Sequence, residues 1–238
     1  MAHAQLSKAP GKPDFTAELI VGGIDQSDPE VAWAGVHIRL GPHWHTYWRS
    51  PGDAGAPPDF DWSTSQNLTA ADVEWPAPRR LTEEGIDTFG YTDEVVFPVR
   101  LRLRDPDAPA LISLNLTLFV CGTICTRNDL HFDALLSPGV RFIGPRELID
   151  TWRDKVPRAH AAGLSIASAT LLSKPEPSVR LMVIAAAPLQ APDVFVDGDG
   201  GVVGGHAQVV ARDGNSATII VPLRGPHAAN PGQALSLT

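Results

Sequence analysis

Short apolar runs separated by proline, glycine and polar residues extend through most of the chain. Leu111–Cys121 shows the pattern best, because leucine at every second position alternates with serine, asparagine and threonine. A period of two places one face of a strand in a core and the other in water. The sequence therefore predicts strands at Phe15–Val21, Val31–Leu40, His43–Trp48, Val73–Trp75, Val95–Leu103, Leu111–Cys121, Leu130–Leu136, Leu164–Leu172, Val179–Ala186, Val194–Val196, His206–Ala211 and Ala217–Leu223.

Two segments depart from this period. In Pro145–Val156 apolar residues recur at helical spacing, among them Leu148, Ile149 and Trp152, and a proline suits the first turn of a helix. The segment from Leu81 to Thr92 is polar apart from its aromatic residues, and we expect it to be a long loop. After the helix, residues 157–163 are expected to be a linker, and a second β domain is expected to begin near residue 160.

Composition agrees with a β protein and narrows the choice of partner. The 238 residues include 22 prolines and 21 glycines, which lie between the apolar runs, and this is typical of all-β chains. The net charge of −8 argues against nucleic acid or an anionic membrane surface as the main partner. No apolar run is long enough to span a bilayer. The first residues lack the basic and apolar regions of a signal peptide as they stand.

Cys121 and Cys125 are the only cysteines, and Gly122, Thr123 and Ile124 separate them. In a straight strand, positions four apart lie about 13 Å apart, whereas a disulfide needs Cα atoms within roughly 7 Å. If the pair forms a bond, the chain must therefore turn, and Gly122 is suited to that turn. As a brace the bond would do little, because closing so short a ring contributes about 2 kcal/mol in the loop-entropy account.

The pair has three interpretations. It is a redox-active dithiol, activated by a cation such as Arg127 or a neighbour such as His131; or a structural pair; or half of a metal site. His43 and His45, at alternate strand positions, could add to two thiolates to bind Cu(I), but a histidine-rimmed surface explains them as well.

The aromatic sequence Phe89-Gly90-Tyr91 also has two interpretations. Its rings could pack in the core, or they could form a mobile cap that shields a dithiol from wrong partners. The sequence alone does not choose between them.

Three motifs together resemble a known family. They are His43-Trp44-His45-Thr46-Tyr47-Trp48-Arg49-Ser50-Pro51-Gly52-Asp53, then Gly90-Tyr91 ahead of Val95–Val99, and Val120-Cys121-Gly122-Thr123-Ile124-Cys125. A β-rich domain with these motifs resembles the N-terminal periplasmic domain of the DsbD family, in the branch called suppressor of copper sensitivity protein B (ScsB). The resemblance is clearest over residues 12–140. The DsbD domain itself has a longer segment between its cysteines than the three residues here.

The resemblance implies an all-β fold of two tandem immunoglobulin-like β-sandwich domains with a short helical linker. We expect a redox domain at 1–144, a helical and linker segment at 145–162 and a smaller immunoglobulin-like domain at 163–238. It also implies a soluble periplasmic domain of an inner-membrane protein, and full-length relatives carry a membrane domain and a thioredoxin-like domain after this region.

The function implied by the resemblance is that of a thiol:disulfide oxidoreductase without a cofactor or a metal. It would pass electrons from the transmembrane domain of the same protein to periplasmic thioredoxin-fold proteins, of the disulfide isomerase or peroxiredoxin-pathway type. By similarity, Cys125 would form the mixed disulfide with the partner, Cys121 would resolve it, and Phe89, Gly90 and Tyr91 would form the cap. The alternatives are a periplasmic copper-binding protein, with a role in copper tolerance, and a scaffold module with an incidental disulfide.

Overall fold

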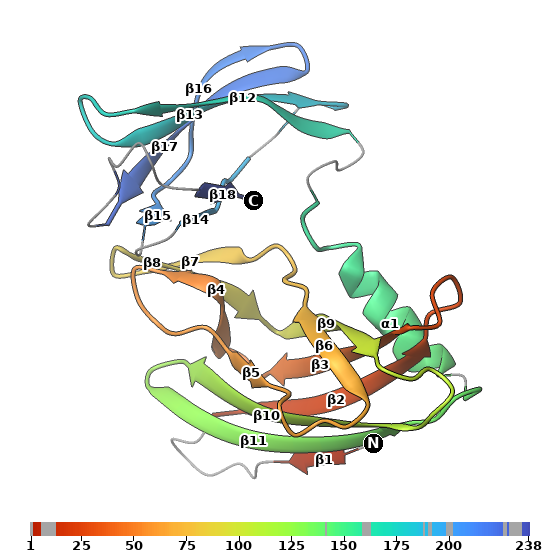
Figure 1. Ribbon diagram of the computed structural model, residues 1–238. Coiled ribbons are helices and arrows are strands. Elements are labelled where there is room, and N and C mark those ends of the chain that lie inside the picture. Colours follow the sequence, from red (N-terminus) through yellow and green to blue (C-terminus); the bar gives the residue numbers. More distant parts are fainter. Residues whose placement is uncertain are drawn as a thin grey trace. The chain divides into compact units, whose positions relative to one another are not determined.

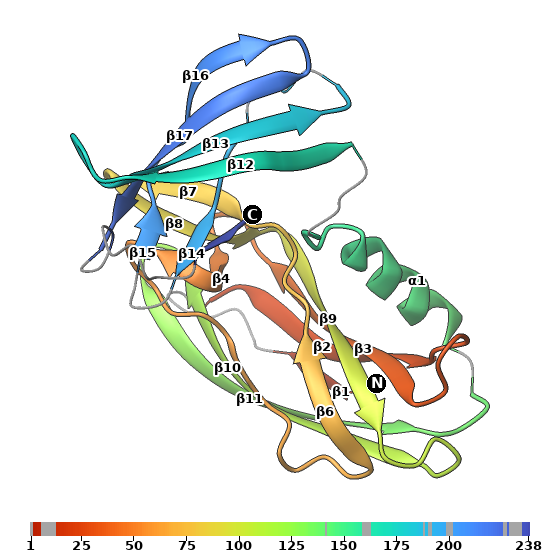
Figure 2. The ribbon, with the colours of Figure 1, turned by 45° about the horizontal axis from the view of Figure 1, so that its top comes forward.

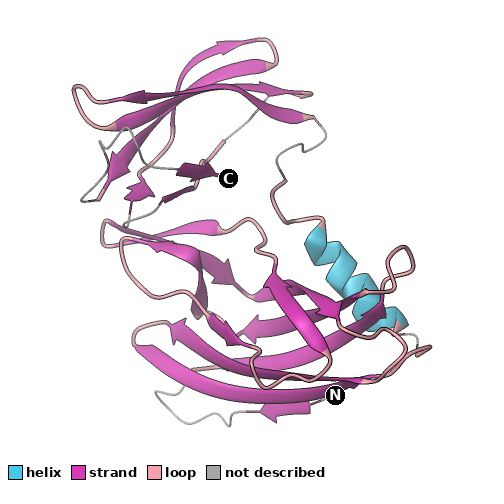
Figure 3. Ribbon diagram, in the orientation of Figure 1, coloured by secondary structure: helices cyan, strands magenta, loops and turns pink. Residues whose placement is uncertain are grey.

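The computed structural model describes residues 2–5, 13–140, 142–158, 163–187, 189, 192–198, 202–225, 228 and 235–238. Residues 1 and 6–12 near the amino terminus, and residues 159–162 of the expected linker, lie outside the described residues. Within them the chain is almost entirely β-sheet, with a helix α1 at Ile143–Arg153, so the all-β prediction is confirmed (Figure 3). The strands are β1 Ala2–Gln5, β2 Phe15–Ile24, β3 Val31–Leu40, β4 His45–Gly52, β5 Asp59–Asp61, β6 Leu68–Val73, β7 Arg79–Glu83, β8 Ile86–Thr92, β9 Glu94–Leu103, β10 Ala110–Cys121, β11 Cys125–Leu136, β12 Leu164–Leu172, β13 Ser178–Ala185, β14 Val196–Gly198, β15 Val202–Gly204, β16 Gln208–Asp213, β17 Ser216–Arg224 and β18 Leu235–Leu237.

The chain forms two compact units. The first contains Met1–Thr82 and Thr88–Val156, and the second contains Glu83–Asp87 and Pro157–Thr238. Helix α1 is therefore part of the first unit. The division into domains at 1–144, 145–162 and 163–238 stays a prediction.

The first unit is a sandwich of two antiparallel sheets (Figure 1). One sheet has the strand order β1-β2-β3-β9-β6, and the other has β11-β10-β4-β8-β7 with β5 beside β10. Aromatic side chains join the two sheets at the centre. The ring of Phe97 on β9 lies 5.3 Å from Tyr91 on β8 and 5.4 Å from Phe60 on β5, measured between centroids. Edge-to-face contacts of this kind are favourable beyond the area that they bury.

The alternating leucines of β10 supply much of the remaining core. Leu114, Leu116 and Leu118 are at most 1% exposed, while Asn115 between them is exposed. Each buried leucine contributes about 2 kcal/mol through the area removed from water. The strand predicted at Leu111–Cys121 is thus confirmed, and it places its last residue, a cysteine, at the end of the sandwich core.

The segment predicted to be a long loop is a β-hairpin. Strands β7 and β8 occupy most of residues 81–92, and they are joined at Glu84 and Gly85, whose φ angles are +50° and +83°. Two central residues with positive φ match the twist of a two-residue hairpin turn. The loop prediction was wrong because β7 is mostly polar and gives no apolar alternation.

Other strand predictions also need correction, and the strand predicted at Val194–Val196 begins only at Val196, as β14. Strand β11 begins at Cys125 rather than Leu130, because the polar residues that precede Leu130 are drawn into the sheet by pairing with β10 along its whole length. The short strand predicted at Val73–Trp75 lies earlier, as β6, where it pairs with β9.

The second unit is also built of antiparallel strands (Figure 2). Its order is β12-β13-β17-β15-β14-β18, with β16 beside β17. Strand β17 pairs with β13 over most of its length and with β15 at its end. Side chains from these strands form a separate apolar core, which includes Leu181, Val183, Val196, Ile219 and Val221.

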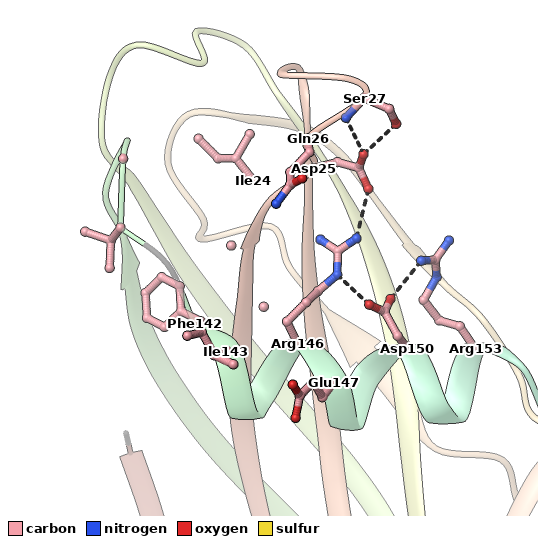
Figure 4. Close-up of a pocket in the computed structure, with 14 residues that line it drawn as sticks. Ile24, Asp25, Gln26, Ser27, Phe142, Ile143, Arg146, Glu147, Asp150 and Arg153 are labelled. Carbon is pink, nitrogen blue, oxygen red and sulfur yellow. Dashed lines mark hydrogen bonds and ion pairs between the residues drawn. The ribbon is translucent and has the colours of Figure 1, made fainter.

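Helix α1 begins slightly earlier than predicted and buries the expected face. Ile149 and Trp152 are its buried side chains, and the helix lies against β2, β3 and β9. Arg146, which is part of this helix, donates to Asp150 at 2.9 Å and to Asp25 at 3.1 Å (Figure 4). Asp25, Arg146 and Asp150 line a cavity of about 860 Å³ between the helix and the end of β2. None of the residues that line this cavity belongs to β10 or β11, which carry the two cysteines.

The carboxylate of Asp25, directly after the end of β2, accepts several hydrogen bonds. The donors are the amide and the hydroxyl of Ser27, Trp33 Nε1 at 2.9 Å and Arg146. The Ser27 hydroxyl, followed by the other donors, holds the pKa of Asp25 well below its ordinary value, although burial acts in the opposite direction. The charged form of Asp25 is therefore stabilised in the folded protein.

We expect Asp25→Asn to lower the free energy of unfolding near neutral pH by about 1–3 kcal/mol, because it weakens hydrogen bonds to a charged acceptor. A lowered folded-state pKa gives stability that is present above the unfolded value and lost as pH falls through the folded value. The difference from the wild type should therefore shrink below about pH 4. Urea denaturation across pH would measure it. Asp72→Asn, at an exposed position on β6, is the control, and a difference that is independent of pH would contradict the prediction.

Candidate functional site

The two cysteines close the β10–β11 hairpin. Cys121 is the last residue of β10 and pairs directly with Cys125, the first residue of β11. Their Cα atoms are 4.0 Å apart and their sulfurs form a disulfide. The predicted turn between them is confirmed, and the Gly122 amide donates to the Ile124 carbonyl at 3.0 Å within it.

The turn passes close to the segment that precedes β4, so glycine is favoured at its first position. A Cβ on Gly122 would lie 3.1 Å from the Trp44 ring and 3.2 Å from the His43 carbonyl oxygen, which is tight packing. Glycine is favoured here by close approach and not by a positive φ angle. The aromatic segment that precedes β4 thus holds the disulfide turn against the end of the sandwich.

The two cysteines differ in their access to solvent. Cys121 is 1% exposed, whereas Cys125 is an exposed residue. Ile124, beside Cys125, keeps 50% of its surface exposed. A second protein can therefore approach the bond through Cys125, next to an apolar side chain that is available for contact.

Strand β4 places a tyrosine and a histidine beside the disulfide. His45 pairs with Cys121 across the strands, and the Tyr47 hydroxyl lies 3.0 Å from Cys121 Sγ and 3.7 Å from Cys125 Sγ. His45 Nε2 lies 3.4 Å from the same hydroxyl. This contact was not predicted from the sequence, although His45 and Tyr47 stand at alternate positions of a predicted strand and therefore share a face.

The structure separates the two histidines that were considered as copper ligands. His43 is exposed in a turn with φ of +68°, ahead of β4, so the prediction that the strand begins at His43 was wrong. His45 lies on the strand. Among the residues that the structure describes, no group of three or more His, Cys, Asp or Glu side chains is arranged to hold a metal ion. No contact favours the copper-binding alternative.

The three residues expected to form a cap lie on β8, next to the strand that carries Tyr47. Phe89 and Tyr91 are 1% and 5% exposed, and Gly90 pairs with Tyr47 across the sheet. The Tyr91 hydroxyl donates to the Pro76 carbonyl at 2.8 Å, and burial raises its pKa well above the ordinary value. Both rings are packed in the core in this structure, and their role as a cap stays a prediction.

The two basic residues considered as activators lie along β11. Arg127 donates to Asp129 at 3.0 Å, and the Thr117 hydroxyl followed by this guanidinium lowers the pKa of Asp129. His131 pairs with Asn115 and contacts its side chain at 2.8 Å. Six positions along a strand amount to about 20 Å, so His131 does not reach Cys125.

These features define a class of protein. An exposed sulfur, a buried partner sulfur and a hydroxyl donor stand together at the end of an immunoglobulin-like sandwich. Such a pair can undergo thiol–disulfide exchange, in which a thiolate attacks one sulfur and expels the other. The site is therefore that of a thiol:disulfide exchange domain.

Comparison with known proteins finds a family match for the part of the chain that carries the site. Residues 23–137 match the family described as thiol:disulfide interchange protein DsbD, N-terminal. This stretch contains β4, β8 and the whole disulfide hairpin, so the candidate site lies in a region that is similar to the N-terminal domain of DsbD. The resemblance drawn from the three motifs is confirmed.

A solved structure matches the fold over both units. The crystal structure of the N-terminal periplasmic domain of ScsB from Proteus mirabilis covers 98% of this chain and 91% of its own length, with a TM-score of 0.74 and 22% sequence identity. At that identity the match concerns the fold, and it supports two immunoglobulin-like units in succession. Curated protein sequences gave no significant match. Among the described residues, no helix has the length and apolar character needed to cross a membrane.

Proposed function

We propose that this chain is a periplasmic protein-disulfide reductase module of the ScsB branch. It relays electrons from a membrane-embedded reductase domain of the same full-length protein to thioredoxin-fold partners, and its Cys121–Cys125 dithiol is the carrier. The observation that carries the proposal is the asymmetric exposure of the two sulfurs at the hairpin end. The solved relative, which is described as a periplasmic domain, supports the compartment.

The disulfide contributes little to the stability of the fold. Strands β10 and β11 are already paired from Ala110 with Leu136 up to the cysteines themselves. A ring this short adds about 2 kcal/mol at most in the loop-entropy account, against about 4–5 kcal/mol for a ring of roughly 100 residues. A bond that adds so little as a brace, with one sulfur exposed, is better explained as a redox carrier.

The two cysteines then have different roles. In the reduced module, the Cys125 thiolate attacks the partner's disulfide, forms a mixed disulfide and releases one partner thiolate. Cys121 then attacks the Cys125 sulfur as a thiolate, which restores the Cys121–Cys125 bond and releases the second partner thiolate. Two electrons pass to the partner, and its two thiolates take up two protons from solvent or from the Cys121 and Cys125 thiols, which lose theirs as the disulfide forms again.

The partner would dock on the end of the hairpin. Thr123, Ile124 and Cys125 are exposed there, and Ile124 offers an apolar contact beside the reactive sulfur. Thioredoxin-fold partners of the disulfide isomerase or peroxiredoxin-pathway type are the proposed acceptors. The β7–β8 hairpin, which carries Phe89, Gly90 and Tyr91, is the proposed cap.

Trapping of the mixed disulfide tests the relay. We expect Cys121→Ser to form a stable covalent adduct with a thioredoxin-fold domain whose one remaining active-site cysteine carries a thionitrobenzoate leaving group. Release of thionitrobenzoate gives the rate, and intact mass spectrometry gives the product. Cys125→Ser is the matched control and should react far more slowly, because Cys121 is buried. If neither variant forms an adduct, or if the buried cysteine reacts first, the proposed roles are wrong.

A further inference from the structure

The hydroxyl of Tyr47 lies between the two sulfurs and closer to the buried one. Its oxygen is 3.0 Å from Cys121 Sγ and 3.7 Å from Cys125 Sγ. Tyr47 is 3% exposed, so little water competes for this hydroxyl. A donor in such a position is aimed at the sulfur that a visiting protein does not reach.

The direction of the hydrogen bonds follows from the chemistry of the groups. A disulfide sulfur has no proton, so Tyr47 must donate its single O–H proton to Cys121. The Tyr47 oxygen can then only accept from His45 Nε2, which is 3.4 Å away. His45 therefore carries a proton on Nε2 when the full chain of contacts is made, and it polarises the tyrosine hydroxyl toward the sulfur.

We propose that Tyr47 is a catalytic residue of the exchange reaction and that His45 is its positioning residue. When a thiolate attacks Cys125 Sγ, the bond to Cys121 breaks and its electron pair remains on Cys121 Sγ as a thiolate. The Tyr47 O–H donates to this thiolate while it forms, and in the opposite direction it holds the Cys121 sulfur ready to attack. This inference rests on the proposed function, because it assigns a role within the same site.

The expected effect comes from the change in charge on the accepting sulfur. A neutral disulfide sulfur is a weak acceptor, whereas a thiolate is a charged one, and charge-assisted hydrogen bonds are about twice as strong as neutral ones. The hydrogen bond therefore strengthens as the disulfide opens. Burial makes this contribution larger, because Cys121 has little access to stabilising water.

Reduction by dithiothreitol tests the proposal without any protein partner. One dithiothreitol thiolate attacks Cys125, and its second thiol then completes a cyclic disulfide and releases Cys125, so that two electrons and two protons enter the protein. For Tyr47→Phe we expect the rate constant of this reduction and its equilibrium constant each to fall by about tenfold. For a two-electron couple, a tenfold change is about 30 mV toward more negative potentials.

Ser113→Ala is the matched control for the loss of a buried hydroxyl. Ser113 is 4% exposed, and its hydroxyl accepts a hydrogen bond from the Thr64 hydroxyl at 3.0 Å. It lies eight positions before Cys121 on β10, so the rate and the potential should stay those of the wild type. His45→Ala should lower both constants in the same direction by a smaller factor. His45→Gln, which keeps an N–H donor, should restore part of the loss.

Two results would overturn the proposal. One is a folded Tyr47→Phe variant with the wild-type rate and potential, and the other is an equal loss in Ser113→Ala. If Tyr47→Phe does not fold, the half-buried His45→Ala variant decides, and a wild-type rate and potential there would also overturn it. Because dithiothreitol replaces the protein partner, these results are independent of whether the mixed-disulfide trapping succeeds.

Discussion

Replacing Cys125 by serine is expected to abolish electron transfer from this module to a thioredoxin-fold acceptor. Cys125 is the exposed sulfur, and without it the only remaining thiol would be Cys121, which is 1% exposed. Removal of the attacking nucleophile costs at least about a thousandfold in rate. The measurement is the rate at which the reduced protein reduces an oxidised acceptor, followed by the acceptor's tryptophan fluorescence in stopped flow.

The matched variant Cys121→Ser should separate the two half-reactions. We expect it to keep the first half, the attack of Cys125 on the acceptor, and to lose turnover because nothing resolves the mixed disulfide. Both variants lack the same disulfide, and its loss should lower the free energy of unfolding of each by about 2 kcal/mol or less. An acceptor reduced at the wild-type rate by Cys125→Ser would show that the exposed sulfur is not the carrier.

The second large effect is expected at Gly90, which pairs with Tyr47. A Cβ built on Gly90 would collide with the carbonyl oxygen of Thr46, and it would also lie 3.2 Å from the Tyr47 Cα. Both neighbours are backbone atoms, so relief requires the strands to separate. We therefore expect Gly90→Ala to lower the free energy of unfolding by about 3 kcal/mol or more, measured by urea denaturation.

Gly144→Ala provides the control for this substitution. Gly144 lies in the first turn of α1, and a Cβ added there meets nothing within 4 Å. The helix propensity of alanine and the restraint from the following Pro145 act in opposite directions, so the free energy of unfolding should change by less than about 1 kcal/mol. If Gly90→Ala proved as stable as the wild type, the close pairing of β4 and β8 that supports Tyr47 would be contradicted.

Strands rich in apolar residues were predictable from the sequence, and mainly polar strands were not. Val31–Leu40 and Leu164–Leu172 have the bounds that were predicted, although the first strand is almost wholly buried and the second is almost wholly exposed. The first half of β11 and all of β7 were missed, because their residues are mainly polar and exposed. Those strands form because a neighbouring strand offers unpaired amide and carbonyl groups. The spacing of apolar residues along the sequence does not reveal such pairing.

At the candidate site, too, the sequence predicted some features and only the structure showed the others. The sequence identified Cys121 and Cys125, and it placed His45 and Tyr47 within a motif of the family without giving either a role beside the sulfurs. Tyr47 and Cys121 are 74 positions apart in the chain, so only the pairing of β4 with β10 brings them together. Phe89, Gly90 and Tyr91 were singled out by the aromatic character of their motif, and their role as a cap stays a prediction. The burial of Tyr91 follows from its packing against Phe97 on β9, which the sequence does not show.

The sequence by itself determined that this is a β protein and that its two cysteines can bond only across a turn, because both conclusions follow from local spacing along the backbone. Only the tertiary structure decided which sulfur faces solvent and which side chain donates to the other. Exposure and hydrogen bonding depend on strands that meet from distant parts of the chain, and the packing of the sandwich buries Cys121 beside Tyr47 while it leaves Cys125 at the surface.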